Sequence, residues 1–499
     1  MKKLLIFLFF IVSSLFSSDL FIQKGHYLVT YDNLKLPNNE NLGLLGTSYV
    51  YDFENYYLGL GIYSAVSGER GGFFTGGIEG GYRYRFLNDF TLDAGVFLGG
   101  GGGGSAPQGG GLMLRPHIGI TYDVLDYKVG LGVSKVKFPN GDIDSNQVYL
   151  QVAIPFDVVH KKNKNSPMIL DDIKNFMKDS GKDLGWSDTY FSLTIQRYMI
   201  PNGVKNTSGA LVKEDMSLIG FEYGRDFTKN IFAFVETAGA GGGGADGYAE
   251  ILGGVGYKQP LGKNYGFTVQ ASLGAAGGGR VDTGGGVVHK ESLGLYMALS
   301  KKLVASTKLG YMGAIDGEFK ATTFRINFDY KLKSLSSGKN LEFLDSYESF
   351  GEHEWNMQFS NQYYFSDSSI RKNGDDTAMN LIGFKIDRYF NNGFYLSGQA
   401  LGAYSGKSGG YAVGLVGLGK RISYNKSINF FAQILGGVAG GGNVASGDGF
   451  VYQPMIGVEY KVSDSFGIQT SLGKVKAING ELDTAVLDIA FSYKFKTIN

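Results

Sequence analysis

Cysteine is absent from all 499 residues of this chain, which excludes disulfide bonds, thiolate metal sites and a cysteine nucleophile. Histidine is scarce, with five residues, and no two of them have the spacing of paired metal ligands. The sequence also lacks a complete phosphate-binding loop motif. The formal net charge is +1, so neither nucleic acid nor a strongly charged partner is expected. We therefore predict no metal, no cofactor and no enzyme activity.

Long apolar runs are missing as well, except at the start of the chain. Two lysines precede an apolar run over residues 4–16, and small residues follow it. This pattern predicts a signal peptide over residues 1–18. Its cleavage site stays open, because Phe16 is a poor residue three positions before a cut after Ser18. Beyond residue 20, no apolar run reaches the roughly 18 residues that a membrane-spanning helix needs.

The sequence has an internal repeat instead. A glycine-rich stretch ends at Gly104, again at Gly279 and again at Gly442, at spacings of 175 and 163 residues. A turn centred on a glycine recurs at nearly the same spacings. Three copies of one pattern predict three similar units. The predicted units are residues 20–157, 189–332 and 353–499, separated by a linker with one short amphipathic helix (158–188) and a serine-rich linker (333–352).

Each copy alternates between apolar and polar residues, as strands with one apolar face do. The alternation is clearest over 264–275, where Phe267 and Val269 share one face while Thr268 and Gln270 share the other. Very short turns alternate with longer, glycine-rich loops, as in bacterial outer-membrane barrels. In the second copy, eight strands are predicted near 189–200, 213–226, 229–240, 246–258, 264–275, 286–299, 302–312 and 321–332.

The polar face distinguishes a membrane barrel from a soluble sandwich. A soluble sheet carries long charged side chains on its open face, whereas here glycine, serine, threonine and glutamine dominate that face. Aromatic residues fall near predicted strand ends, as an interfacial girdle requires. The pattern therefore favours strands that cross a membrane as a closed barrel, because open edges are not tolerated in hydrocarbon. The aromatic residues in question are Phe86, Tyr122, Tyr257, Tyr265, Tyr330 and Tyr460.

Over residues 20–499 the chain resembles the broad class of bacterial outer-membrane β-barrel proteins. Its last predicted strand, residues 487–495, resembles the aromatic-ended strand that the outer-membrane assembly machinery reads, although four residues follow it. The resemblance implies an all-β transmembrane barrel in the outer membrane. It also implies membrane lipid and the β-barrel assembly machinery as partners. It identifies no particular family and no surface ligand.

Three eight-stranded barrels and one barrel of about 24 strands are both compatible with this pattern. Balanced charges and phenylalanines (Phe97, Phe234, Phe431) at inward positions slightly favour three small, side-chain-filled barrels, because bare rings gain little in a wide aqueous lumen. The predicted inward polar network comprises Glu222, Glu236, Glu250, Lys290, Lys308 and Arg325 in the second copy, and Glu79, Asp93, Arg83 and Arg115 in the first. We interpret these carboxylates as partners of the cations and not as general acids.

The glycine runs and two prolines are interpreted as architecture. Glycine lets strands bend sharply or lets backbones approach closely where hairpins leave the membrane. A flexible or ligand-contacting surface formed by these hairpins is the functional alternative. Pro116 and Pro454 fall at matching positions inside strands, which suggests a shared bulge.

Three functions remain open at this stage. The first is a non-enzymatic outer-membrane protein with a structural or surface-interaction role through its glycine-rich loops. The second is a porin-like channel for small solutes. The third is a soluble periplasmic or secreted β-repeat protein.

Overall fold

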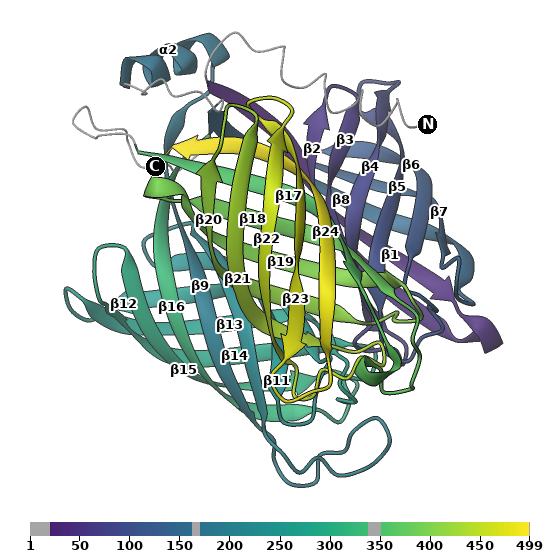
Figure 1. The fold of residues 1–499 in the computed structure, drawn as a ribbon. Coiled ribbons are helices and arrows are strands. Elements are labelled where there is room, and N and C mark those ends of the chain that lie inside the picture. Colours follow the sequence, from purple (N-terminus) through teal and green to yellow (C-terminus); the bar gives the residue numbers. More distant parts are fainter. Residues whose placement is uncertain (1–19, 162–169, 338–350, 499) are drawn as a thin grey trace.

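The computed structural model describes residues 20–161, 170–337 and 351–498 (Figure 1). The predicted signal peptide and parts of both predicted linkers lie outside these ranges. Within them the chain forms 24 β-strands, one α-helix and three short 3-10 helices. None of the helices in the described ranges is long and apolar enough to cross a membrane.

The first eight strands form a closed antiparallel barrel. Each strand pairs with the next along the chain, and the last returns to pair with the first from Leu20–Lys161 to Asp32–Tyr149. The strands are β1 (Leu20–Lys35), β2 (Asn41–Phe53), β3 (Tyr56–Ser67), β4 (Phe74–Arg85), β5 (Phe90–Gly102), β6 (Met113–Val124), β7 (Tyr127–Lys137) and β8 (Asp144–Lys161).

The second barrel repeats this topology and closes through β9 and β16, from Met199–Thr322 to Leu184–Ser337. Helix α2 (Leu170–Ser180) precedes it. Its strands are β9 (Leu184–Met199), β10 (Met216–Asp226), β11 (Ile231–Gly242), β12 (Ala249–Pro260), β13 (Tyr265–Gly277), β14 (Val287–Ala298), β15 (Leu303–Ala314) and β16 (Lys320–Ser337).

The third barrel closes through β17 and β24, from Glu352–Ile498 to Tyr364–Val486. Its strands are β17 (Glu352–Tyr364), β18 (Met379–Tyr389), β19 (Phe394–Ser405), β20 (Ala412–Ser423), β21 (Ile428–Gly440), β22 (Phe450–Lys461), β23 (Phe466–Ala477) and β24 (Asp483–Ile498). A single bridge between Lys161 and Lys496 joins the first and third barrels into one hydrogen-bonded network.

The all-β, antiparallel fold predicted from the alternation is therefore confirmed. Each set of eight strands also completes its own ring of hydrogen bonds, and the three rings lie side by side in Figure 1. A ring of eight leaves an interior just wide enough for side chains. This geometry places every inward residue within reach of the opposite wall.

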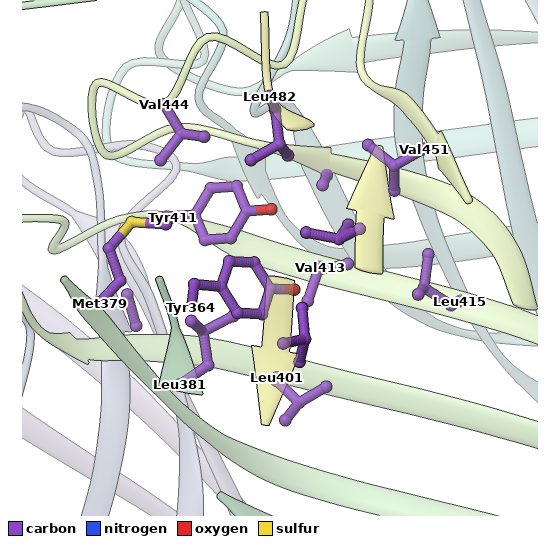
Figure 2. Close-up of a cluster of buried hydrophobic side chains, with 14 of the residues drawn as sticks. Tyr364, Met379, Leu381, Leu401, Tyr411, Val413, Leu415, Val444, Val451 and Leu482 are labelled. Carbon is purple, nitrogen blue, oxygen red and sulfur yellow. The ribbon is translucent and has the colours of Figure 1, made fainter. Parts of the chain in front are cut away.

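Each barrel is filled at its long-loop end by an apolar cluster. In the third barrel, Tyr364 and Tyr411 lie in this cluster among aliphatic side chains from seven strands, together with the loop residues Val444 and Leu482 (Figure 2). Equivalent clusters fill the second barrel around Tyr248 and the first around Tyr63. The long loops thus fold over the barrel ends.

The strands beside the linkers are longer than the alternation predicted. Residues 158–161, 184–188 and 333–337, which lie in the predicted linkers, continue β8, β9 and β16 as two-stranded ribbons beyond the barrel rim. They are ordered as strands because they pack together. A buried cluster joins residues of all three barrels to Ile173 of helix α2 at this short-turn end (Leu20, Val159, Leu184, Trp186, Leu335 and Ile498).

The two strand prolines do not form the predicted bulge. Pairing of β6 with β7 stops at Leu114–Lys137 and resumes at His117–Ser134 in the same register, so no residue is inserted. Pro454 interrupts β22 and β23 in the same way. Proline has no N–H and removes ladder bonds on one side of its strand only. True register shifts occur elsewhere, between the second and third strands of every barrel.

Candidate functional site

The inward network of the second barrel is a chain of buried ion pairs. Lys290 Nζ lies 2.8 Å from Glu236 Oε1 and 2.8 Å from Glu250 Oε1. Arg325 Nη1 lies 3.2 Å from Glu222 Oε2 and also contacts Glu236. All six predicted residues of this network are buried, and the geometry brings them into one connected group.

Amide and phenol groups complete this network. Lys308 Nζ lies 3.7 Å from Glu222 and donates a 2.8 Å hydrogen bond to Gln270 Oε1. The Tyr198 hydroxyl donates to Glu250 at 2.7 Å. Buried charge is tolerated only when it is paired and hydrogen-bonded, and these partners supply that compensation. The sequence pattern missed Tyr198 because tyrosine was read as an apolar residue.

The first barrel pairs its charges differently from the prediction. Arg83 contacts Asp93 at 3.2 Å, as expected, but Arg115 pairs with Asp32 at 2.9 Å. Glu79 instead accepts hydrogen bonds from the hydroxyl groups of Ser48 at 3.1 Å and Tyr63 at 3.0 Å. Asp32 was missed although it alternates with the apolar positions of β1. Strand alternation reveals the face of a residue but not its partner across the barrel.

His117 belongs to the same buried group. Its Nε2 lies 3.5 Å from Asp93 and its Nδ1 lies 3.8 Å from Glu79. Tyr57 donates a 2.9 Å hydrogen bond to Asp93 and lies 3.2 Å from His117. Within the described residues, no group of three or more potential ligands is arranged to hold a metal ion. The carboxylates here already accept hydrogen bonds from fixed neighbours, so the arrangement favours structural over acid–base chemistry.

The third barrel has a group of amides in its interior as well as ion pairs. Gln399 donates to Gln453 at 3.1 Å, and Gln453 donates to Gln362 at 3.3 Å. In the same interior, Lys385 forms an ion pair with Asp488. The glutamines were not predicted as a site because isolated amides carry no charge signal.

The outer faces of the barrels are apolar. Val269 is 44% exposed and Leu273 57% exposed, whereas Thr268 and Gln270 between them are buried in the interior. The faces of β13 therefore lie as the alternation predicted. Tyr257 and Tyr265 are exposed near the short-turn end of the same wall, in the position of an interfacial girdle.

The glycine-rich hairpins form contacts between barrels. Gly71 N donates to Gly284 O at 2.9 Å, which joins the first barrel to the second. Gly410 N donates to Gly101 O at 3.1 Å, which joins the third barrel to the first. A Cβ on Gly440 would lie 2.2 Å from the backbone nitrogen of Gly247, so the second and third barrels also touch through backbone. Only glycine permits approach this close.

We call these contacts between barrels the glycine junction. The same pair of hairpins meets at each of the three contacts. The hairpin between the third and fourth strands of each barrel contacts the hairpin between the fifth and sixth strands of the next barrel. The contacts run from the first barrel to the second, the second to the third and the third back to the first. Three head-to-tail contacts thus close a ring, as in a cyclic trimer. The predicted close approach of backbones is realised between barrels.

Side chains secure the glycine junction at its edges. Lys372 Nζ of the third barrel lies 2.6 Å from Asp246 of the second. Within the first barrel, Arg70 donates two hydrogen bonds to Glu40, which raise the pKa of the Arg70 guanidinium, and a third to the carbonyl of Ser105, and these contacts hold the hairpin of Gly71. The hairpins at this end are therefore joined from barrel to barrel by backbone contacts and by the Lys372–Asp246 ion pair.

No protein-family model matches the sequence, and no curated protein matches it. Solved structures do match. They include OccK11 (OpdR) of Pseudomonas aeruginosa, with 10% identity, coverage of 95% of this chain and 96% of that chain, and a TM-score of 0.22. The siderophore receptor PirA of Acinetobacter baumannii matches with 9% identity, 96% and 81% coverage, and a TM-score of 0.28. At such TM-scores the likeness does not extend to the overall arrangement.

The membrane assignment follows from the molecule's own geometry. Closed antiparallel barrels pair the backbone within the wall, here with gaps at Pro116 and Pro454, and a closed barrel is the form in which strands cross a bilayer. The described strands thus form closed antiparallel β-barrels with apolar outer faces, as the sequence predicted.

Proposed function

We propose that this chain is a non-enzymatic outer-membrane protein whose three barrels are rigid membrane-embedded supports for the surface at the glycine junction. The observation that carries the proposal is the filling of the barrels. An apolar cluster occupies the long-loop end of each barrel, and buried polar networks occupy the middle. A solute would have to break both layers to pass.

The long-loop end is the natural place for a surface role. Long loops of outer-membrane barrels face the cell exterior and short turns face the periplasm. The glycine junction would therefore lie outside the cell, where it could present one continuous surface. Glycine backbones carry no distinctive recognition chemistry, so they do not indicate which molecule would bind this surface.

A porin-like channel is the second candidate function. The third barrel favours it most, because three glutamines of its interior, Gln362, Gln399 and Gln453, hydrogen-bond one another. Rearranging neutral amides costs less than separating buried ion pairs. If any of the barrels conducts, we expect it to be this one.

Conductance in a planar lipid bilayer tests the two candidates. The purified full chain should insert without producing unitary current steps, and it should show heat-modifiable mobility in gels. Reproducible steps would overturn the support role in favour of the channel. Release of the protein from cells by osmotic shock alone would instead favour the soluble periplasmic alternative.

A further inference from the structure

Two outward-facing grooves occur at matching positions in the first and third barrels. The groove of the third barrel has a volume of about 770 Å³ and lies over β20 to β23. The groove of the first barrel, about 630 Å³, lies over β6 to β8. Four lining residues correspond between the two: Pro454, Ile456, Leu472 and Lys474 in the third barrel match Pro116, Ile118, Val133 and Lys135 in the first.

Each groove follows the gap that a proline opens in the strand ladder. The pairing of β22 with β23 skips Pro454, and that of β6 with β7 skips Pro116. In the second barrel the equivalent residue is Glu291, which pairs with Tyr311 in an uninterrupted ladder. The missing N–H of proline therefore accounts for the ladder gaps under the grooves of the first and third barrels, whereas the corresponding ladder of the second barrel is uninterrupted.

The floors of both grooves are apolar and open to the surroundings. Ile434 and Ile456 are 60% and 68% exposed in the third barrel, and Ile118 and Val133 are exposed in the first. On a barrel inside a bilayer these side chains face acyl chains. A groove of this composition fits a flexible hydrocarbon chain.

The long-loop end of each groove carries excess positive charge. Lys474 and Lys476 share one carboxylate, Asp483, at 2.5 and 3.4 Å. Lys135 and Lys137 share Asp144 at 2.6 and 3.6 Å. Two ammonium groups and one carboxylate leave one positive charge at each rim. The second barrel has Tyr311 and Gly313 at the two lysine positions.

We propose that each groove binds one acylated, phosphate-bearing lipid of the outer leaflet. An acyl chain would lie along the proline gap, and a headgroup phosphate would contact the lysine pair. Charge complementarity supports an anionic headgroup, because lysines near a membrane surface contribute roughly 1 kcal/mol each to the attraction of anionic lipid. The second barrel, with Glu291 and Tyr311, binds no such lipid. This inference rests on the proposed role of the barrels as membrane-embedded supports.

Native mass spectrometry of the full chain in detergent, titrated with lipid A, tests the proposal. We expect each chain to bind two lipid A molecules. Binding of zwitterionic phosphatidylcholine should be weak and should not reach saturation. The K474S/K476S variant and the K135S/K137S variant should each lose one site, with an affinity about thirtyfold weaker there. The quadruple variant should lose both sites.

A matched control removes equal charge from the same end of the second barrel. Lys205 and Lys213 are exposed there, and K205S/K213S should keep both lipid A molecules. Two bound lipids on the quadruple variant, or equal binding of phosphatidylcholine, would overturn the inference. Heat-modifiable mobility recorded on the same samples separates this failure from failure of the membrane proposal. If the chain folds and requires detergent but binds no lipid A, the lipid-binding inference is refuted and the membrane proposal is not.

Discussion

The second and third barrels have the same topology and register but fill their interiors with different chemistry. Tyr257 pairs with Val269 in the second barrel, and Lys420 pairs with Ala432 at the equivalent place in the third, 163 residues later. At equivalent inward positions, Glu222 and Arg325 form an ion pair in the second barrel. Lys385 and Asp488 form the same pair with opposite polarity in the third.

A second pair of equivalent inward positions also carries different residues in the two barrels. Glu236 and Lys290 of the second barrel are an ion pair at 2.8 Å. Gln399 and Gln453 occupy these positions in the third barrel and are joined by a 3.1 Å hydrogen bond. The barrel wall therefore requires inward groups that satisfy one another, but it does not require particular charges.

Removing one member of an ionic network should have the largest effect. Arg325→Leu leaves Glu222 and Glu236 without their guanidinium partner, and we expect it to lower the free energy of unfolding by about 3–5 kcal/mol. Gln399→Leu in the third barrel should cost only about 1–3 kcal/mol, since it leaves neutral groups unpaired. Urea unfolding in detergent micelles compares the two. Equal costs would mean that the interiors are energetically alike despite their chemistry.

Arginine on the outer faces should have a smaller effect, and the same effect in both barrels. Val269→Arg and Ala432→Arg each place a charge against the acyl chains at equivalent positions, at an expected cost of about 2–4 kcal/mol. Refolding yield and urea midpoint in lipid vesicles measure this cost. Tyr265→Arg, at the interfacial end of the wall, is the control and should cost at most about 1 kcal/mol. A large difference between Val269→Arg and Ala432→Arg would show that the two barrels do not face the same lipid.

The smallest of these effects is expected where the two barrels touch. Gly440→Val places side-chain atoms into the backbone of Gly247 across the glycine junction. We expect a loss of about 1–3 kcal/mol, as for overpacking in a core. Gly436→Val lies on the same strand with its nearest Cβ contact at 3.9 Å, and it should be close to neutral. Thermal shifts of gel mobility report both variants. If the two behave alike, the glycine junction does not stabilise the chain.

Alternation and the internal repeat were sufficient to predict three antiparallel units, their outward faces and ten inward polar residues of the first two units. These features depend on the side-chain period of two, which any strand obeys whatever its neighbours are. The position of Thr268 and Gln270 inside and of Val269 outside follows from that period alone. The signal-peptide prediction lies outside the described residues and stays a prediction.

The tertiary structure alone decided how the units close and meet. Ring closure depends on hydrogen bonds between strands about 140 residues apart, such as β9 and β16, and local pattern cannot distinguish this pairing from one large ring. The partner of Arg115 is Asp32 because barrel curvature, not sequence spacing, sets which side chains meet across an interior. The glycine runs acquired their meaning in the same way. Their composition indicates that backbones can approach, but only the packing of three barrels shows which backbones do.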